Sequence, residues 1–135
     1  MRKGITPIIS IIVLLLITVA LAGVAWTYLS GYMETYTKGA FTITTGGVYC
    51  STDGIHVLVN NPTTSPILES DFITKTATGD TGTHTLDLQV NGADATQIDA
   101  KGHGDFVTNC GGTCSGSYTI DIGTTASIQH LSVSC

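Results

Sequence analysis

Four cysteines are the residues of this 135-residue chain best suited to chemistry: Cys50, Cys110, Cys114 and Cys135. An even number of cysteines in a small exported domain usually indicates disulfides, and four cysteines allow three pairings. Cys110 and Cys114 flank a turn-like Gly-Gly-Thr segment, across which a local bridge is geometrically reasonable. We therefore expect Cys110 to pair with Cys114. Cys50 then pairs with Cys135.

Metal binding is the competing use of these cysteines. A Cys-x3-Cys element with His103 and His130 resembles half of a zinc site, but structural zinc sites usually draw closely spaced ligand pairs from both halves of the site, and the sequence has no second pair. The aspartates near glycine-containing loops, Asp94, Asp99 and Asp105, lack the regular spacing of a calcium loop. We expect no metal and no cofactor.

Catalytic motifs give no support for an enzyme. The sequence contains no G-x-S-x-G elbow, no phosphate-binding loop and no H-E-x-x-H helix. The four histidines share no common spacing: His56, His84, His103 and His130. If all four cysteines are oxidised, none is available as a nucleophile. We expect a chain without enzymatic activity.

The element most unlike the rest of the chain is an N-terminal apolar segment, with no charged side chain between Lys3 and Glu34. Its apolar run of about 25 residues, at ~1.5 Å per residue, spans roughly 37 Å as a helix, which is enough to cross a bilayer core of about 30 Å. We expect a helix over residues 5–38, because Gly39 is the residue type that ends helices most cheaply.

A cleaved secretory signal would have a shorter apolar region and a small-x-small cleavage site. Ala20-Leu21-Ala22 resembles such a site, but the apolar run continues past it to Leu29, which disfavours cleavage there. Arg2 and Lys3 precede the run, and no basic residue follows it before Lys38. This asymmetry predicts a cytoplasmic N-terminus, so that everything after Tyr36 lies outside the cell.

The stretch RKGITPIISIIVLLLITVALAGVAWTYLSGY resembles the N-terminal region of archaeal type IV pilins and the related archaellins. The resemblance implies that a class III signal peptidase removes residues 1–4 by cutting between Gly4 and Ile5. It also implies that the helix is kept, as a bilayer anchor before assembly by the pilus machinery and as the filament core afterwards. Bacterial type IV pilins usually have Glu at the fifth mature position, where this chain has Ile9, so the archaeal branch is favoured.

Small residues inside the apolar run predict how such a core packs. Small side chains let helices approach closely in lipid, and the helix-packing candidates are Ala20, Ala22, Gly23 and Ala25. A uniformly apolar helix needs apolar surroundings on every side, and both a bilayer and a bundle of identical helices supply them.

Beyond Gly39 the hydrophobic period changes to that of strands. Five short runs are rich in Thr, Val, Ile and Tyr and are divided by Gly, Asn, Asp and Pro: FTITTGGVY, IHVLVN, THTLDLQV, SYTIDI and SIQHLSV. Asn91-Gly92 is a favoured hairpin turn. We expect an α+β fold, in which the hydrophobic helix precedes a small antiparallel, immunoglobulin-like β-sandwich over residues 39–135.

Charge is scarce in this chain. Lys and Arg number 5 against 10 Asp and Glu, for a net charge of -5, so a basic face for nucleic acid is not expected. Threonine is abundant, which fits β propensity. Glycosylation is the functional alternative. No N-x-S/T acceptor exists, so any glycan would be attached through Ser or Thr.

The sequence hypothesis is therefore a pilin, a structural subunit that polymerises with itself into an extracellular adhesive filament after insertion in the cytoplasmic membrane. One alternative is an archaellin of a motility filament. Another is a monomeric, membrane-anchored extracellular binding module whose helix never leaves the lipid.

Overall fold

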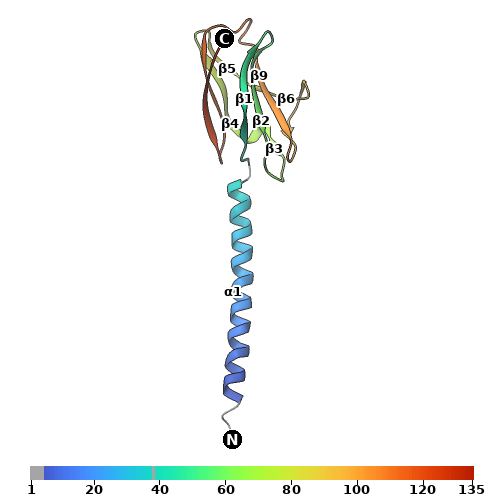
Figure 1. Ribbon diagram of the computed structural model, residues 1–135, viewed down its shortest axis with the longest axis vertical. Helices are drawn as coiled ribbons and strands as arrows, with labels where there is room; N and C mark the ends of the chain where they lie inside the picture. The colour runs from blue at the N-terminus through green and yellow to red at the C-terminus, as the bar shows by residue number, and fades with distance from the viewer. Residues whose placement is uncertain (1–4, 38) are drawn as a thin grey trace. The chain divides into compact units, whose positions relative to one another are not determined.

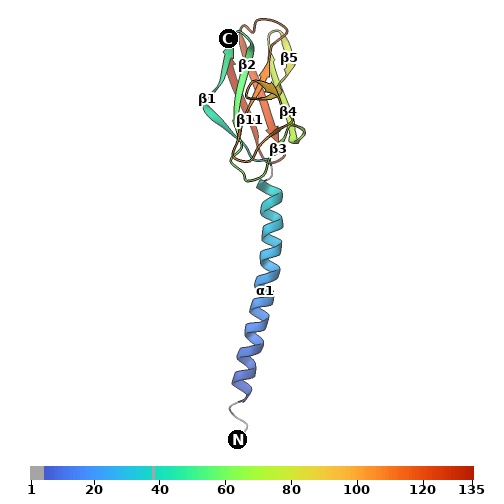
Figure 2. The same cartoon turned by 90° about the vertical axis from the view of Figure 1, so that its right-hand side faces the viewer.

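The computed structural model describes residues 5–37 and 39–135, with side chains for residues 6–33 and 39–135. The chain divides into two units, Met1–Tyr36 and Thr37–Cys135, each treated by itself below. The first unit is one helix and the second is built from antiparallel sheets, so the expected α+β class with a sandwich-like head is confirmed (Figures 1 and 2).

Helix α1 runs over Ile5–Thr37, within one residue of the expected end. Pro7 lies in its first turn, where a missing N–H costs little because the first amides of a helix have no intrahelical acceptor. Gly39 has a φ of 80°, the left-handed conformation that suits glycine after a helix. Lys38, the last residue of the expected helix, lies outside the described residues.

Two sheets form the head. The first sheet has the strand order β1-β2-β9-β6-β7 and the second has β11-β10-β4-β5, while β3 and β8 form a separate pair. Their bounds are β1 Thr42–Ser51, β2 Gly54–Asn60, β3 Ile67–Leu68, β4 Phe72–Gly79, β5 Gly82–Thr85, β6 Asp87–Val90, β7 Ala93–Asp94, β8 Gln97–Ile98, β9 His103–Thr108, β10 Ser117–Thr124 and β11 Ile128–Ser134. A single 3₁₀ turn, Glu69–Asp71, precedes β4.

The core lies between the inner faces of the two sheets. In β10, Tyr118, Ile120 and Ile122 are buried, while Thr119 is exposed, as the alternating pattern predicts. The first sheet contributes its own fully buried side chains, among them Val57, Val59, Leu88 and Phe106. Alternation along each strand thus gives the head a core of its own.

One expected strand is two strands in the structure. The run THTLDLQV divides at Leu86, with β5 in the second sheet and β6 in the first. Leu86 is fully buried at the crossing, and its N–H donates to the Lys75 carbonyl at 2.9 Å. The chain therefore changes sheets without losing the apolar alternation that made it look continuous.

Beside the two-residue strands β3, β7 and β8, two longer strands fall outside the five predicted runs, β4 and β9. Their sequences, FITKTATG and HGDFVT, contain a lysine, an aspartate and glycines that weaken the strand pattern. Gly104 in β9 is required by packing, because a Cβ there would lie 2.8 Å from side-chain atoms of Ile98 and Leu88. The glycine that obscures the strand thus serves the close approach of neighbouring elements.

The turns agree better with expectation. Asn91 and Gly92 connect β6 to β7, with φ values of 54° and 78°, as in a hairpin turn that needs two left-handed residues. The turn between β4 and β5 is flanked by Gly79 and Gly82, which are paired with each other. The expected immunoglobulin-like topology stays a prediction.

Candidate functional site

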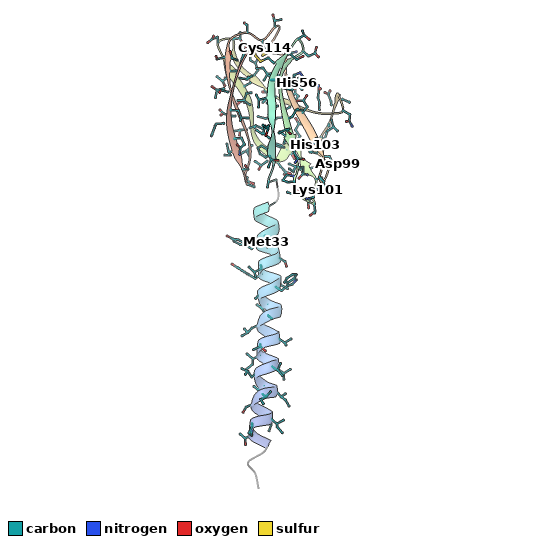
Figure 3. All side chains as sticks on the ribbon, in the orientation of Figure 1. Met33, His56, Asp99, Lys101, His103 and Cys114 are labelled. Carbon is teal, nitrogen blue, oxygen red and sulfur yellow. A yellow bond between two sulfur atoms is a disulfide. The ribbon has the colours of Figure 1, made fainter. Side chains whose placement is uncertain are left out.

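The most unusual surface among the described residues is that of α1. Its described side chains are all exposed, and they project all around the helix (Figure 3). Large apolar residues such as Leu16, Val24 and Trp26 are 66%, 67% and 74% exposed. The 28-residue stretch Thr6–Met33 is long and apolar enough to cross a membrane, as judged by length and composition. Within this unit the apolar surface of the helix is therefore exposed.

Four hydroxyl groups of the helix donate to carbonyls of the same helix. Ser10 donates to the Thr6 carbonyl at 2.9 Å, Thr18 to that of Leu15 at 2.8 Å and Ser30 to that of Trp26 at 2.8 Å. Thr27 donates to the carbonyls of Gly23 and Val24 at 3.3 and 2.9 Å. These bonds follow the i to i−3 or i−4 pattern and leave no hydroxyl donor of the four unpaired in apolar surroundings.

The four packing candidates do not share one face. At about 100° per residue, Ala20 and Gly23 lie close together around the helix, whereas Ala22 and Ala25 lie on another side. Gly23 also starts a series that the sequence reading missed, Gly23-Thr27-Gly31, in which small residues recur every fourth position. That spacing is the signal that would have revealed it.

Space around Gly23 is open inside this chain, since a Cβ added there would have no neighbour within 4 Å outside its own helix backbone. No contact within the unit therefore requires glycine. The helix has thus two sides on which a neighbouring helix could approach its backbone closely, one at Ala20, Gly23 and Thr27 and one at Ala22 and Ala25.

The cysteines pair as the sequence favoured. Cys50 is bonded to Cys135 and Cys110 to Cys114, with Cα–Cα distances of 5.6 and 5.5 Å, and no free cysteine is found in the described part of the chain. Disulfides are typical of proteins in oxidising, extracytoplasmic compartments. Gly4, on one side of the expected cleavage site, lies outside the described residues, and of Ile5 the structure describes the backbone alone.

A second candidate surface is polar and lies on the head. A hollow of about 660 Å³ is lined by residues of both sheets, including His56, His84, Asp87 and Asp94. His56 Nδ1 lies 2.7 Å from Asp105 Oδ2, and its ring stacks on Tyr49 with centroids 4.9 Å apart (Figure 3 labels His56). Within residues 5–37 and 39–135, no three His, Cys, Asp or Glu side chains are grouped to hold a metal ion. Among the described residues, the hollow therefore lacks a metal-binding group of side chains.

The remaining candidates for chemistry lie apart from one another. His130 Nδ1 pairs with Asp121 Oδ1 at 2.6 Å on the outer face of the second sheet. His103 is exposed at the start of β9, and Asp99 makes a local hydrogen bond with Gln97 at 2.8 Å. The structure brings none of these groups together with the Cys110–Cys114 bridge.

Comparison of the chain with models of known protein families found no match. Searches of curated proteins and of solved structures found no significant match either.

Proposed function

We propose that this chain is the structural subunit of an extracellular type IV pilus-like filament that serves adhesion. The observation that carries the proposal is the contrast between the two units. The head buries its own core and is stapled by two disulfides, whereas α1 exposes large apolar side chains on every described side. A helix of this kind needs an apolar environment from outside the chain.

A bilayer and a helix bundle both supply that environment. Transfer from one to the other exchanges lipid contacts for helix contacts at little hydrophobic cost, and close packing at small residues supplies the preference. The small residues around Ala20, Gly23 and Thr27 support a bundle, because a simple anchor has no need of them. The internal hydrogen bonds of the hydroxyls suit either environment.

In this proposal a class III signal peptidase cuts between Gly4 and Ile5, and the pilus machinery moves the helix from the cytoplasmic membrane into a helical homopolymer. The heads then face outward in many copies. Two disulfides suit the exposed position of such heads. Repeated display of one head makes weak individual contacts additive, which fits adhesion.

The test is electron microscopy of filaments sheared from cells that produce the chain, with identification of their subunit by mass spectrometry. We expect thin filaments composed of this chain. Filaments that rotate in swimming cells would identify an archaellin instead. Protein that stays entirely in the membrane fraction, in cells without such filaments, would favour the anchored binding module and overturn the proposal.

A further inference from the structure

The two sheets of the head each end in an edge strand on the same side of the sandwich, and these two edge strands lie side by side. β1 ends the first sheet and β11 ends the second, and the Cys50–Cys135 bridge joins them at one end. No backbone hydrogen bond links β1 to β11 in the part of the chain that the structure describes. An edge strand presents unpaired N–H and C=O groups that can pair with another chain.

A bulge interrupts the pairing of β1 with β2 beside the second edge. Ile43 pairs with Val59 and Val48 with Val57, so Thr44–Gly47 lies opposite Leu58 alone. Away from the disulfide, a groove of about 500 Å³ opens between the strands. We call it the seam groove, and its lining includes Ile43, Thr44 and Val48 of β1 and Gln129, Leu131 and Ser132 of β11. Part of the β11 edge thus lines an open groove.

The core is incompletely covered at the seam groove. Ile43, Val48 and Leu131 pack against the core but are only half-buried, whereas core residues such as Val57 and Ile120 are fully buried. An extended segment laid along β11 would cover these apolar side chains while it paired with the free backbone groups. Strand addition of this kind gives affinity through main-chain hydrogen bonds.

On the opposite side of the head, negatively charged side chains lie near the sheet edges. Asp80 precedes β5, Asp87 begins β6 and Asp94 ends β7, so carboxylates stand beside the edges there. Neither β1 nor β11 contains Lys, Arg, Asp, Glu or Pro. Charges and prolines are the usual means of preventing edge-to-edge pairing. The ionisable side chain of β11 is His130, which is paired with Asp121. In a chain of net charge -5, these edges without carboxylates are where two copies can meet without like-charge repulsion.

We propose that the seam groove is a self-association surface, in which an edge strand of a second copy of this chain pairs with β11 between Gln129 and Ser132. The occupant is a second copy because polymerisation through α1 would hold identical heads near one another at an effective concentration on the order of millimolar. The inference therefore rests on the proposed function, although its own readout is local to β11.

Amide hydrogen exchange of the full chain, followed by mass spectrometry of the peptide that contains β11, tests the proposal. Dispersed chains are held one per lipid nanodisc, and associated chains are prepared both as sheared filaments and as densely loaded liposomes. We expect the groove-facing amides of β11 to exchange at least tenfold more slowly in the associated samples. Equal exchange in dispersed and associated chains would overturn the proposal.

Ser132→Lys places a charge at the groove and should abolish this protection. Thr119→Lys is the matched control, because Thr119 pairs with Ser132 on the adjacent strand and is exposed on the same face. It should keep the protection. Slow exchange in β2 and β10 shows that each variant is folded, and Gln129→Lys replaces Ser132→Lys if that variant is not. Protection that survives the groove lysine would also contradict strand pairing.

Failure of this proposal and failure of the proposed function can be told apart. If microscopy finds no filaments, the densely loaded liposomes still report whether heads pair through β11. If filaments form and the β11 amides stay unprotected, the subunit function stands and the seam groove is not the contact.

Discussion

Asn61 connects three segments of the head through one fully buried side chain. Its Nδ2 donates to the carbonyls of Ser65 and Asp99 at 2.8 and 3.0 Å, and its Oδ1 accepts from the N–H and hydroxyl of Thr63 at 3.0 and 2.7 Å. The local sequence Asn60-Asn61-Pro62 indicates only a turn that ends a strand. Its role in joining β2 to the loop after β8 required the fold.

Asn61→Ala should therefore destabilise the head strongly. The substitution leaves buried carbonyls and an amide without partners, and each such group costs about 1–3 kcal/mol. We expect a loss of more than about 3 kcal/mol in the free energy of unfolding, measured by denaturant titration of the full chain in detergent. Asn109→Ala is the control, since Asn109 is exposed and makes one local bond to the Gly111 amide. Similar losses for the two variants would contradict this account.

At the scale of the element, α1 is the part of the chain that sequence describes most completely. Its length and its end near Gly39 were both predicted from local pattern. The structure adds that the small residues lie on two sides of the helix. Which residues share a side depends on the helical period across several turns. The predictions for α1 concern its N-terminus and its packing.

Processing is tested at the start of the helix. We expect N-terminal sequencing of protein from surface filaments to begin at Ile5, because class III cleavage retains the apolar helix. Loss of Arg2 and Lys3 changes the side-chain charge from -5 to (5 − 2) − 10 = -7. A mature terminus near Gly23 would instead indicate ordinary secretory cleavage and would rule out a helical filament core.

Packing is tested by Gly23→Leu. The segment stays apolar, so membrane insertion should be unchanged, while the larger side chain obstructs close approach of a neighbouring helix. Nothing in this unit contacts a Cβ at that position, so the helix itself should not be disturbed. We expect normally processed, membrane-held protein and at least a tenfold loss of filaments by microscopy.

Val24→Leu serves as the control for this change, because it alters an exposed apolar residue that is already large. It should assemble like the parent chain. Filament numbers for Gly23→Leu that match those of Val24→Leu would show that close approach at Gly23 is not required.

At the scale of the whole molecule, the two disulfides close loops of very different length. The sequence separation is 85 residues for Cys50–Cys135 and 4 residues for Cys110–Cys114. In the chain-entropy model these loops correspond to roughly 4.6 and 1.9 kcal/mol, because the cost of closing a loop in the unfolded chain rises with its length.

Removing the long bridge should therefore cost more stability than removing the short one. We expect the Cys50→Ala/Cys135→Ala variant to lose about 2–3 kcal/mol more unfolding free energy than Cys110→Ala/Cys114→Ala. Thermal unfolding of the head in the full chain, followed by near-ultraviolet circular dichroism, measures the difference. Equal melting temperatures for the two variants would show that chain entropy does not account for these bridges.

Local patterns in the sequence were enough for the helix, the α+β class, the Asn91-Gly92 turn and the inward face of β10. Each of these depends on residues close together in the chain, whose period or turn geometry is a local property. The two cysteine pairs were favoured for the same reason, since the short spacing of Cys110 and Cys114 left one partner for Cys50.

Tertiary structure alone decided the division at Leu86, the strands β4 and β9, the burial of Asn61 and the open edge of β11. The strand pattern of β4 is interrupted by Lys75, which pairs with Glu69 at 2.5 Å. The glycine in β9 fits between Ile98 and Leu88, which come from other elements. Strand order and edges depend on contacts between residues far apart in sequence, where packing and hydrogen bonding override the preference of any single segment.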